Sequence, residues 1–292
     1  MVAPAAEAAM PTLPTRAALQ TALQRDGFVI LRRLFLPSEV AALGVAVDRL
    51  SARLRGLPPG EHDLDGAVAV IAPSGGVARV VWVAAADADL DRCSRDRRLV
   101  ALAALALGGR RFDQLIAQLH PKEPGDAVEF DWHQDAVHRR HGTEAWTDVD
   151  GHGSYLQTLL AIDACTLDNG PLCFVPGSHG RGALPHSAAR TLPIEALRGA
   201  RPVPALLAPG DVAIFGPFVI HGSTPNQGDA PRRVLVSGFA LPGANHRAYP
   251  GRGSGRRLDL DRLDPAAPAC AAVATVAPVA TVAPSAATAK AP

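Results

Sequence analysis

The chain has 292 residues, of which 48% are hydrophobic, and its formal net charge is +1. This length suits one large β domain with helical additions, and a charge so close to zero provides no overall field that would attract nucleic acid or a membrane surface. The first residues have neither a basic segment nor a long apolar run, so we expect no secretory signal and no membrane span. The four cysteines form no C-x-x-C pair, which predicts reduced thiols in a cytoplasmic protein rather than a zinc site or a disulfide framework.

Helical patterns separated by short strands fill the first third of the chain. Thr15 is a candidate N-cap and Gly27 a candidate end for the first helix. Pro37 opens a second helix, whose apolar residues recur at the spacing of one buried face: Val40, Leu43, Val47, Leu50 and Leu54. The remaining expectations are a strand at 28–31, a Gly/Pro/Asp-rich loop at 55–76, a strand at 77–83 and an Ala/Leu-rich helix at 97–107.

Strands dominate after this helix. Short apolar runs are separated by turns rich in Gly, Pro, Asn and Asp, a pattern that is typical of an all-β barrel or a double-sheet jelly roll. The predicted strands are 112–120, 128–135, 155–163, 172–175, 203–207, 211–215 and 234–240.

The two ends of the chain have a different composition. Residues 1–14 are rich in Ala and Pro, and residues 265–292 contain VATVAP twice in succession with a single charged residue. Such segments lack the large apolar side chains that a packed core requires, so we expect both to be disordered. The predicted organisation is therefore one domain over residues 15–264.

A candidate metal site lies in residues 132–135, with the sequence WHQD. On a strand, His133 and Asp135 would point to the same face and could hold one metal ion, although a hydrogen-bonded surface pair is also compatible with H-x-D. His221, which follows an apolar run, offers a third ligand. Two histidines and one carboxylate on one side of a metal form the facial triad of non-haem Fe(II) oxygenases.

Arg232 and Arg233 precede the last predicted strand. Adjacent strand residues face opposite sides, so only one of them can point into a barrel. A buried guanidinium requires an anionic partner, and its planar fork suits a carboxylate. The pair therefore indicates a site for a dicarboxylate co-substrate, and the alternative is two surface arginines beside an edge strand.

Taken together, these motifs resemble the phytanoyl-CoA dioxygenase (PhyH) family of Fe(II)/2-oxoglutarate-dependent oxygenases, from about residue 19 to residue 242. The motifs that carry the resemblance are RDGFVIL at 25–31, WHQD at 132–135, DNGPL at 168–172, VPGSH at 175–179 and HGS followed by PRR within 221–233. The resemblance implies a mainly β (α+β) fold, a double-stranded β-helix of jelly-roll or cupin type, with the N-terminal helices packed on one face.

The resemblance also implies the site residues and the reaction. His133, Asp135 and His221 would bind Fe(II) and form the catalytic centre. Arg232 would bind the C5 carboxylate of 2-oxoglutarate, with Gln118 and Leu159 beside this co-substrate. Dioxygen would be the second co-substrate, and succinate and CO2 would be released. Related halogenases have a small residue at the position of the acidic ligand, so Asp135 favours hydroxylation of an unactivated C–H bond over halogenation. The histidine of VPGSH, His179, is expected to be structural.

The substrate is indicated by the basic run that follows WHQD. His138, Arg139 and Arg140, followed by His141, should lie at the mouth of the barrel, which favours a small anionic substrate such as a modified amino acid, an acyl group or a secondary metabolite. A solvated charged loop is the alternative. The same cofactors also serve desaturation, epimerisation or cyclisation, and a non-catalytic protein that binds a metal or ligand is a further alternative. We expect a monomer or homodimer with no nucleic-acid or membrane partner.

Overall fold

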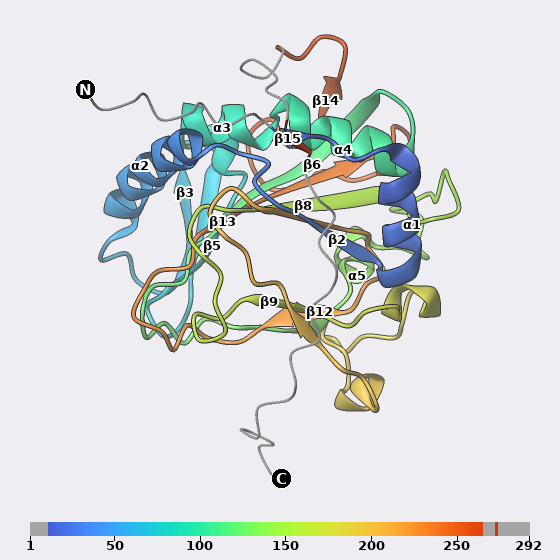
Figure 1. Cartoon of the computed structure of the whole chain (residues 1–292). Helices are drawn as coiled ribbons and strands as arrows, with labels where there is room; N and C mark the ends of the chain where they lie inside the picture. The colour runs from blue at the N-terminus through green and yellow to red at the C-terminus, as the bar shows by residue number, and fades with distance from the viewer. Residues whose placement is uncertain (1–10, 265–271, 274–292) are drawn as a thin grey trace, which may run out of the picture.

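Figure 1 shows the computed structural model of the protein, which describes residues 11–264 and 272–273. The larger sheet contains, in order, β2 (Phe28–Leu31), β11 (Val212–Phe215), β8 (Tyr155–Ala161), β13 (Val234–Ala240), β6 (Arg111–His120), β5 (Val77–Val81), β4 (Ala67–Ile71) and β3 (Gly60–Leu64), with β14 (Arg256–Asp259) also paired to β6. The smaller sheet contains β10 (Val203–Pro204), β9 (Leu172–Phe174), β12 (His221–Ser223) and β7 (Phe130–His133). The two sheets form the double-stranded β-helix that the sequence predicted.

Aromatic side chains join the two sheets across the interior of the barrel. Phe174 of the smaller sheet stacks on Phe28 of the larger sheet with ring centroids 4.3 Å apart. Its ring also meets Phe215 edge-on at 5.1 Å. These contacts close one part of the barrel with packed apolar side chains, so that the remaining interior can hold a cavity.

Four helices cover the outer face of the larger sheet (Figure 1): α1 (Arg16–Asp26), α2 (Pro37–Leu54), α3 (Ala88–Ser94) and α4 (Arg97–Leu107). The predicted caps of α1 are confirmed, because the Thr15 side chain accepts a hydrogen bond from Ala18 N and Gly27 adopts a φ of 84°. The predicted apolar stripe of α2 is buried against the sheet. The N-terminal helices therefore pack on one face, as expected.

The strand β8 separates two apolar regions. Leu156 and Leu160 pack with the helices, whereas Tyr155, Leu159 and Ala161 face the interior between the sheets. This alternation follows from the period of two along a strand. All seven residues of β8 are buried, because helices cover one face of the strand and the barrel interior encloses the other.

Several expectations about local structure were wrong. Residues 55–76 are not a continuous loop, because β3 and β4 form a hairpin there. The strand predicted at 128–135 ends at His133, and Asp135 begins the short helix α5 (Asp135–Arg139) instead of continuing the strand. The short 3-10 helices are Val83–Ala85, Ser178–Arg181 and Ile194–Leu197.

The predicted disordered ends lie largely outside the described residues. Of these two ends, the structure describes the short strands β1 (Pro11–Thr12) and β15 (Ala272–Val273), which pair in parallel. In the part of the chain that the structure describes, none of the helices combines the length and apolar character needed to cross a membrane.

Candidate active site

Three predicted ligand side chains meet between the strands of the smaller sheet. His133 on β7 lies directly opposite His221 on β12 in the antiparallel register, and Asp135 follows at the start of α5. One ligand atom from each residue lies within 4.8 Å of the others. Asp135 Oδ2 is 3.9 Å from His221 Nε2. A strand pair and a helix start, rather than one strand face, thus assemble the triad.

Backbone carbonyl groups orient both histidines. The Nδ1 atom of His133 lies 2.6 Å from the carbonyl oxygen of Asp131, and that of His221 lies 3.0 Å from the carbonyl oxygen of Val219. A proton on Nδ1 that is donated to a carbonyl leaves the lone pair of Nε2 free to bind a metal. The two rings are therefore held in the tautomer that a metal site requires.

Asp135 is placed by the turn that links β7 to α5. The buried Gln134 side chain donates from Nε2 to the carbonyl oxygens of Gly182 (2.8 Å) and Phe218 (2.5 Å), which fixes this turn. The Oδ2 atom of Asp135 is itself buried and has no hydrogen-bond partner among the described residues. A buried carboxylate oxygen without a partner is costly, and a cation between it and the two imidazoles would remove that cost.

The pKa values of the three side chains favour their metal-binding forms. Burial, followed by the charge of His221, lowers the pKa of His133 to about 4. Burial also lowers the pKa of His221. Burial alone would raise the pKa of Asp135, but His221 and Arg139 outweigh it and the pKa lies below its ordinary value. Neutral imidazoles and an ionised carboxylate are the forms that bind a metal.

The two arginines before β13 have opposite environments. Arg232 is only 4% exposed, and its Nη2 donates to the carbonyl oxygen of Gly170 at 2.9 Å. Its Nε is buried and lacks a partner in the described part of the chain. Arg233 points the other way and forms ion pairs with Asp163 (2.7 Å) and Asp48 (2.5 Å). Arg232 is thus the arginine that remains available for an anionic ligand.

A cavity of about 450 Å³ connects these groups. The predicted residues Gln118 and Leu159 line it together with the triad and Arg232. The Gln118 side-chain oxygen lies 3.0 Å from His120 Nε2, which fixes the orientation of this amide. The size is within the range of small-molecule sites. The structure therefore brings the predicted metal ligands and the predicted co-substrate residues into one enclosed space.

The predicted basic run divides between the cavity and the surface. His138 and Arg139 line the cavity. Arg140 is exposed and is not a lining residue, contrary to the expectation that the whole run faces the substrate. His141 turns away, with Nε2 at 2.8 Å from the carbonyl oxygen of Gly153. The run is a short helix with two inward side chains rather than a uniformly charged loop.

Sequence reasoning missed one wall of the cavity, which residues 241–255 form and which we call the return segment. Arg247, Tyr249 and Pro250 of this segment line the cavity. Trp82 holds the segment, because its Nε1 donates to the carbonyl oxygen of Arg252 at 2.8 Å. Gly251 fits here with a φ of +104°, where a Cβ would lie 2.1 Å from that of Trp82. No sequence signal links these residues to the site.

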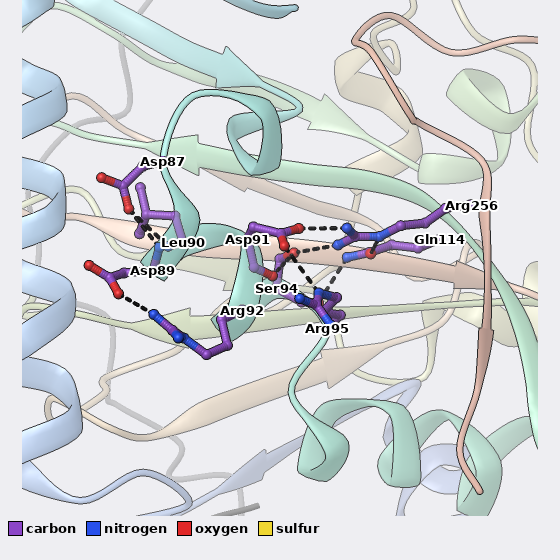
Figure 2. Close-up of polar contacts among 9 residues, drawn as sticks. All are labelled: Asp87, Asp89, Leu90, Asp91, Arg92, Ser94, Arg95, Gln114 and Arg256. Carbon is purple, nitrogen blue, oxygen red and sulfur yellow. Dashed lines mark hydrogen bonds and ion pairs between the residues drawn. The ribbon is translucent and has the colours of Figure 1, made fainter. Parts of the chain in front are cut away.

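The strand β14 anchors the far end of the return segment, as Figure 2 shows. Arg256 donates to the Asp91 carboxylate (2.5 Å), to Gln114 Oε1 (2.8 Å) and to Ser94 Oγ (3.2 Å). Gln114 in turn donates to the carbonyl oxygen of Ser94 at 2.8 Å. These bonds tie the segment to α3 and β6, so the wall is supported at both of its ends.

Two other buried polar residues have distinct positions. Lys122 is fully buried beside the backbone of Arg232, and its Nζ donates to Ser223 Oγ at 2.8 Å. Sequence reasoning did not identify it. His179 lies away from the cavity, with Nε2 at 3.1 Å from the carbonyl oxygen of Gln24, which is compatible with the structural role expected for it.

A double-stranded β-helix with two histidines and one carboxylate at an enclosed cavity has the architecture of the facial-triad class of non-haem iron proteins. The comparison with protein families agrees with this assignment. The chain belongs to the phytanoyl-CoA dioxygenase (PhyH) family, whose model matches residues 23–234. The family resemblance predicted from the motifs is confirmed.

Named relatives and solved structures are similar over different lengths. Ectoine dioxygenase from Bordetella bronchiseptica is 33% identical over 160 residues, which cover 53% of this chain and 47% of that protein. The structure of EctD from S. alaskensis with bound Fe has a TM-score of 0.63 and 25% identity, and covers 80% of this chain and 79% of that one. The α-ketoglutarate-dependent epimerase SnoN from nogalamycin biosynthesis has a TM-score of 0.60 and 21% identity, and covers 82% and 94%.

This chain matches the curated relatives over only part of their length. The chain spans between 32% and 47% of the length of the first curated relatives that it matches. The similarity to SnoN concerns the fold alone. The comparisons therefore show the family and the fold, and the activity of this chain is a separate question.

Proposed function

We propose that this protein is an Fe(II)- and 2-oxoglutarate-dependent dioxygenase that hydroxylates an unactivated C–H bond of a small anionic molecule. The observation that carries the proposal is the shared cavity: the unpartnered Asp135 Oδ2 and the buried Arg232 Nε both lie at its wall. A metal ion and a carboxylate are the ligands that these groups lack. Iron with 2-oxoglutarate combines both in one co-substrate complex.

The chain's own residues would bind and orient this complex. His133, Asp135 and His221 would hold iron on one face and leave the opposite face open to ligands. Arg232 would bind the distal carboxylate of 2-oxoglutarate through charge-assisted hydrogen bonds. Bound iron and 2-oxoglutarate would supply the oxidation of the substrate by dioxygen, with succinate and CO2 as co-products.

The barrel would also position the substrate and exclude water. Leu159 and Phe215 present apolar surface to the cavity beside the triad. Asp135 and His221 are buried and His133 is partly buried, which limits the access of solvent to a bound metal. Such an enclosure fixes the target C–H bond next to the reactive centre and suppresses side reactions.

Desaturation, epimerisation and cyclisation remain the alternative outcomes, because the same cofactors serve these reactions; the epimerase SnoN and the carbocyclase SnoK have this fold. Hydroxylation is favoured by the carboxylate of Asp135 and by the similarity to a relative named methylphosphonate hydroxylase, which is 36% identical over 90 residues. A product that has gained one oxygen atom would support hydroxylation, whereas a product that has lost two hydrogens or inverted a stereocentre would support an alternative. A chlorinated product formed in the presence of chloride would contradict the role assigned to Asp135.

Anaerobic titration of the purified protein with Fe(II) and 2-oxoglutarate tests the proposal. A weak visible charge-transfer band should appear for the wild type, and it should be absent in His133→Ala. Succinate formation on a panel of small acids and acyl compounds then identifies turnover. If neither the band nor succinate is observed, the protein is a non-catalytic family member.

The cytoplasmic location is part of the same proposal. Cys93, Cys165 and Cys173 are free thiols in the described structure, and Cys93 and Cys165 are buried. Free thiols are compatible with a reducing compartment. We expect the protein to act there on a small molecule as a monomer or homodimer.

A further inference from the structure

Arg139 occupies an unusual position for a charged side chain. It is the last residue of α5 and is only 5% exposed. Its guanidinium lies between two tyrosines, with 5.0 Å to the ring centroid of Tyr155 and 5.0 Å to that of Tyr249. The Arg247 guanidinium also lies over the Tyr249 ring, 4.2 Å from its centroid. Two cationic groups and two phenols thus form one cluster at the cavity wall, which we call the tyrosine–arginine cluster.

The cluster contains several hydrogen-bond donors without acceptors. Arg139 Nε and Nη1, Arg247 Nε and the Tyr249 hydroxyl are buried and have no partner within the described residues. Arg247 uses its Nη2 to donate to the carbonyl oxygen of His138. A buried donor that lacks an acceptor destabilises the folded protein. A ligand that supplies acceptor oxygens would remove this cost for several donors together.

Acidic side chains do not neutralise the cluster in the structure. Asp135 is the carboxylate that acts electrostatically on Arg139, but it makes no hydrogen bond to the guanidinium, and the triad assigns it to the metal. The Tyr155 hydroxyl is already engaged, because it donates to Gln157 Oε1 at 2.8 Å. The positive charge of the cluster is therefore available to a ligand in the cavity.

The strand register separates this cluster from Arg232. Tyr155 pairs with Ala240, and Ala161 pairs with Val234, at the opposite ends of the β8–β13 pair. Six residue steps correspond to roughly 20 Å along a strand. Between these ends lies the triad, because the His221 ring packs 4.9 Å from Phe215, which pairs with Gln157, an interior residue of β8. A molecule of 2-oxoglutarate that binds the triad and Arg232 therefore extends from the triad toward the Ala161 end of β8, away from Tyr155 and Arg139.

From this arrangement we infer that the tyrosine–arginine cluster is the subsite for an oxyanion of the substrate, a carboxylate or phosphonate group, with Arg139 as its main cationic donor. The inference rests on the proposed function, because it takes the Arg232 end to be the site of 2-oxoglutarate. The substrate would then extend from the cluster toward the metal, with its target carbon at the triad. Arg140, at the surface, has no part in this recognition.

Gly238 supports the same assignment. A Cβ at this position would lie 1.9 Å from the Tyr155 hydroxyl, so the glycine provides the space in which the Tyr155 ring lies under Arg139. The position of the Tyr155 ring next to Arg139 is thus fixed by Gln157 and Gly238. They act as positioning residues, whereas Arg139, Arg247 and Tyr249 supply the free donors.

The test uses the anaerobic protein loaded with Fe(II) and 2-oxoglutarate. Propionate and methylphosphonate are the anionic probes, and propionamide is the uncharged control. Binding is measured by the rise in melting temperature and by the perturbation of the visible band. The anions should bind the wild type and propionamide should not, since a bound ligand raises the melting temperature of the folded state. The preferred anion identifies which oxyanion the subsite takes.

Variants locate the binding site. Arg139→Met should weaken anion binding by about 10- to 100-fold, as expected for the loss of hydrogen bonds to a charged group, and should leave the affinity for 2-oxoglutarate unchanged. Arg140→Met, on the same helix end, and Arg198→Met, at a distant exposed site, should bind the anions like the wild type. If Arg139→Met fails to fold, Tyr249→Phe retains the cation and should weaken binding by about 2- to 10-fold.

The outcomes separate this inference from the proposed function. Equal anion binding by Arg139→Met and the wild type, or no binding of either anion to the wild type, overturns the subsite. Loss of 2-oxoglutarate binding in Arg139→Met would also overturn it, because the co-substrate would then lie at the wrong end of the cavity. If instead the wild type shows no iron–2-oxoglutarate band but still binds the anions through Arg139, the subsite stands and the proposed function fails.

Discussion

The two ends of the cavity differ in how they are built. At one end, Arg232 precedes β13 and contacts the carbonyl oxygen of Gly170, and both residues lie within the region that the family model matches. At the other end, Arg139 lies against Tyr249 of the return segment, which follows residue 234 and is outside that region. The proposed co-substrate end thus lies within the region that the family model matches, whereas part of the proposed substrate end lies outside it.

The two ends of the cavity also differ in the contacts that hold them in place. The Arg232 end is held by the register between β13, β6 and β8, so its geometry follows from the barrel itself. The return segment forms no strand of the larger sheet. It is held by side-chain contacts from Trp82 and Arg256 and by separate backbone hydrogen bonds, such as the one from Arg252 N to the carbonyl oxygen of Gly66. Changes at one end should therefore leave ligand binding at the other end intact, and the following variants test that independence.

The largest effect is expected for His221→Ala. Loss of a metal ligand should reduce succinate formation by about 1,000-fold or more, since a bound metal contributes several kcal/mol to the stabilisation of the transition state. The anion-induced rise in melting temperature should persist, because the tyrosine–arginine cluster does not include this residue. Loss of both signals in a folded variant would show that the two ends are not independent.

Arg232→Met should weaken 2-oxoglutarate binding by about 30- to 1,000-fold, because one partner of a buried charge pair is removed. Equilibrium titration of the iron-loaded protein measures the effect. Arg233→Met is the matched control: it should keep the affinity for 2-oxoglutarate but lower the free energy of unfolding by about 1–3 kcal/mol through the loss of its hydrogen bonds to Asp163. A reversed pattern between the two variants would assign the co-substrate to Arg233.

Arg256→Met should affect only the substrate end. The variant removes the bonds to Asp91, Gln114 and Ser94 that anchor β14 (Figure 2), so the return segment should hold Tyr249 less firmly. We expect propionate or methylphosphonate to bind about 3- to 10-fold more weakly, with 2-oxoglutarate unaffected. Arg92→Met, which removes an ion pair within α3, is the control and should change neither affinity.

Lys122 should make the stability of the co-substrate end depend on pH. Burial, followed by the charge of Arg232, lowers its pKa from 10.5 to about 6. Between these values the unfolded chain binds more protons than the folded protein, so the free energy of unfolding contributed by this residue rises as pH rises. Relative to Lys122→Met, the wild type should therefore gain stability across this window. Urea unfolding of both proteins at pH 6 and near pH 10 measures the gain. A difference in the free energy of unfolding that stays constant between these pH values would contradict the prediction.

The His133–Asp135 part of the metal triad was accessible to sequence reasoning because the H-x-D spacing is a local signal, whereas His221 was indicated by the apolar run before it and by the family resemblance. The structure brings the first two ligands together through the start of α5 rather than through a continuous strand. Strand alternation predicted that only one of Arg232 and Arg233 faces the interior, and the family resemblance indicated Arg232. The structure separates the environments of the two arginines in that way.

The substrate end was not accessible, because it depends on contacts between distant segments. Tyr249 meets Arg139 only after the return segment crosses the barrel and Trp82 binds Arg252. The β3–β4 hairpin was missed for a different reason, since its Gly- and Asp-rich turns hide short strands whose pairing stabilises them. Neither feature has a local periodicity that would reveal it.

The attachment of the return segment has a consequence for redesign. Residues 241–255 connect two strands of the larger sheet and add no strand of their own to it. A replacement loop that keeps the Trp82 contact and the β14 anchor could therefore be exchanged as a cassette, while β8 and β13 retain their pairing. Libraries confined to this loop would vary the wall of the cavity next to Arg139 and leave the His133–Asp135–His221 triad and Arg232 unchanged.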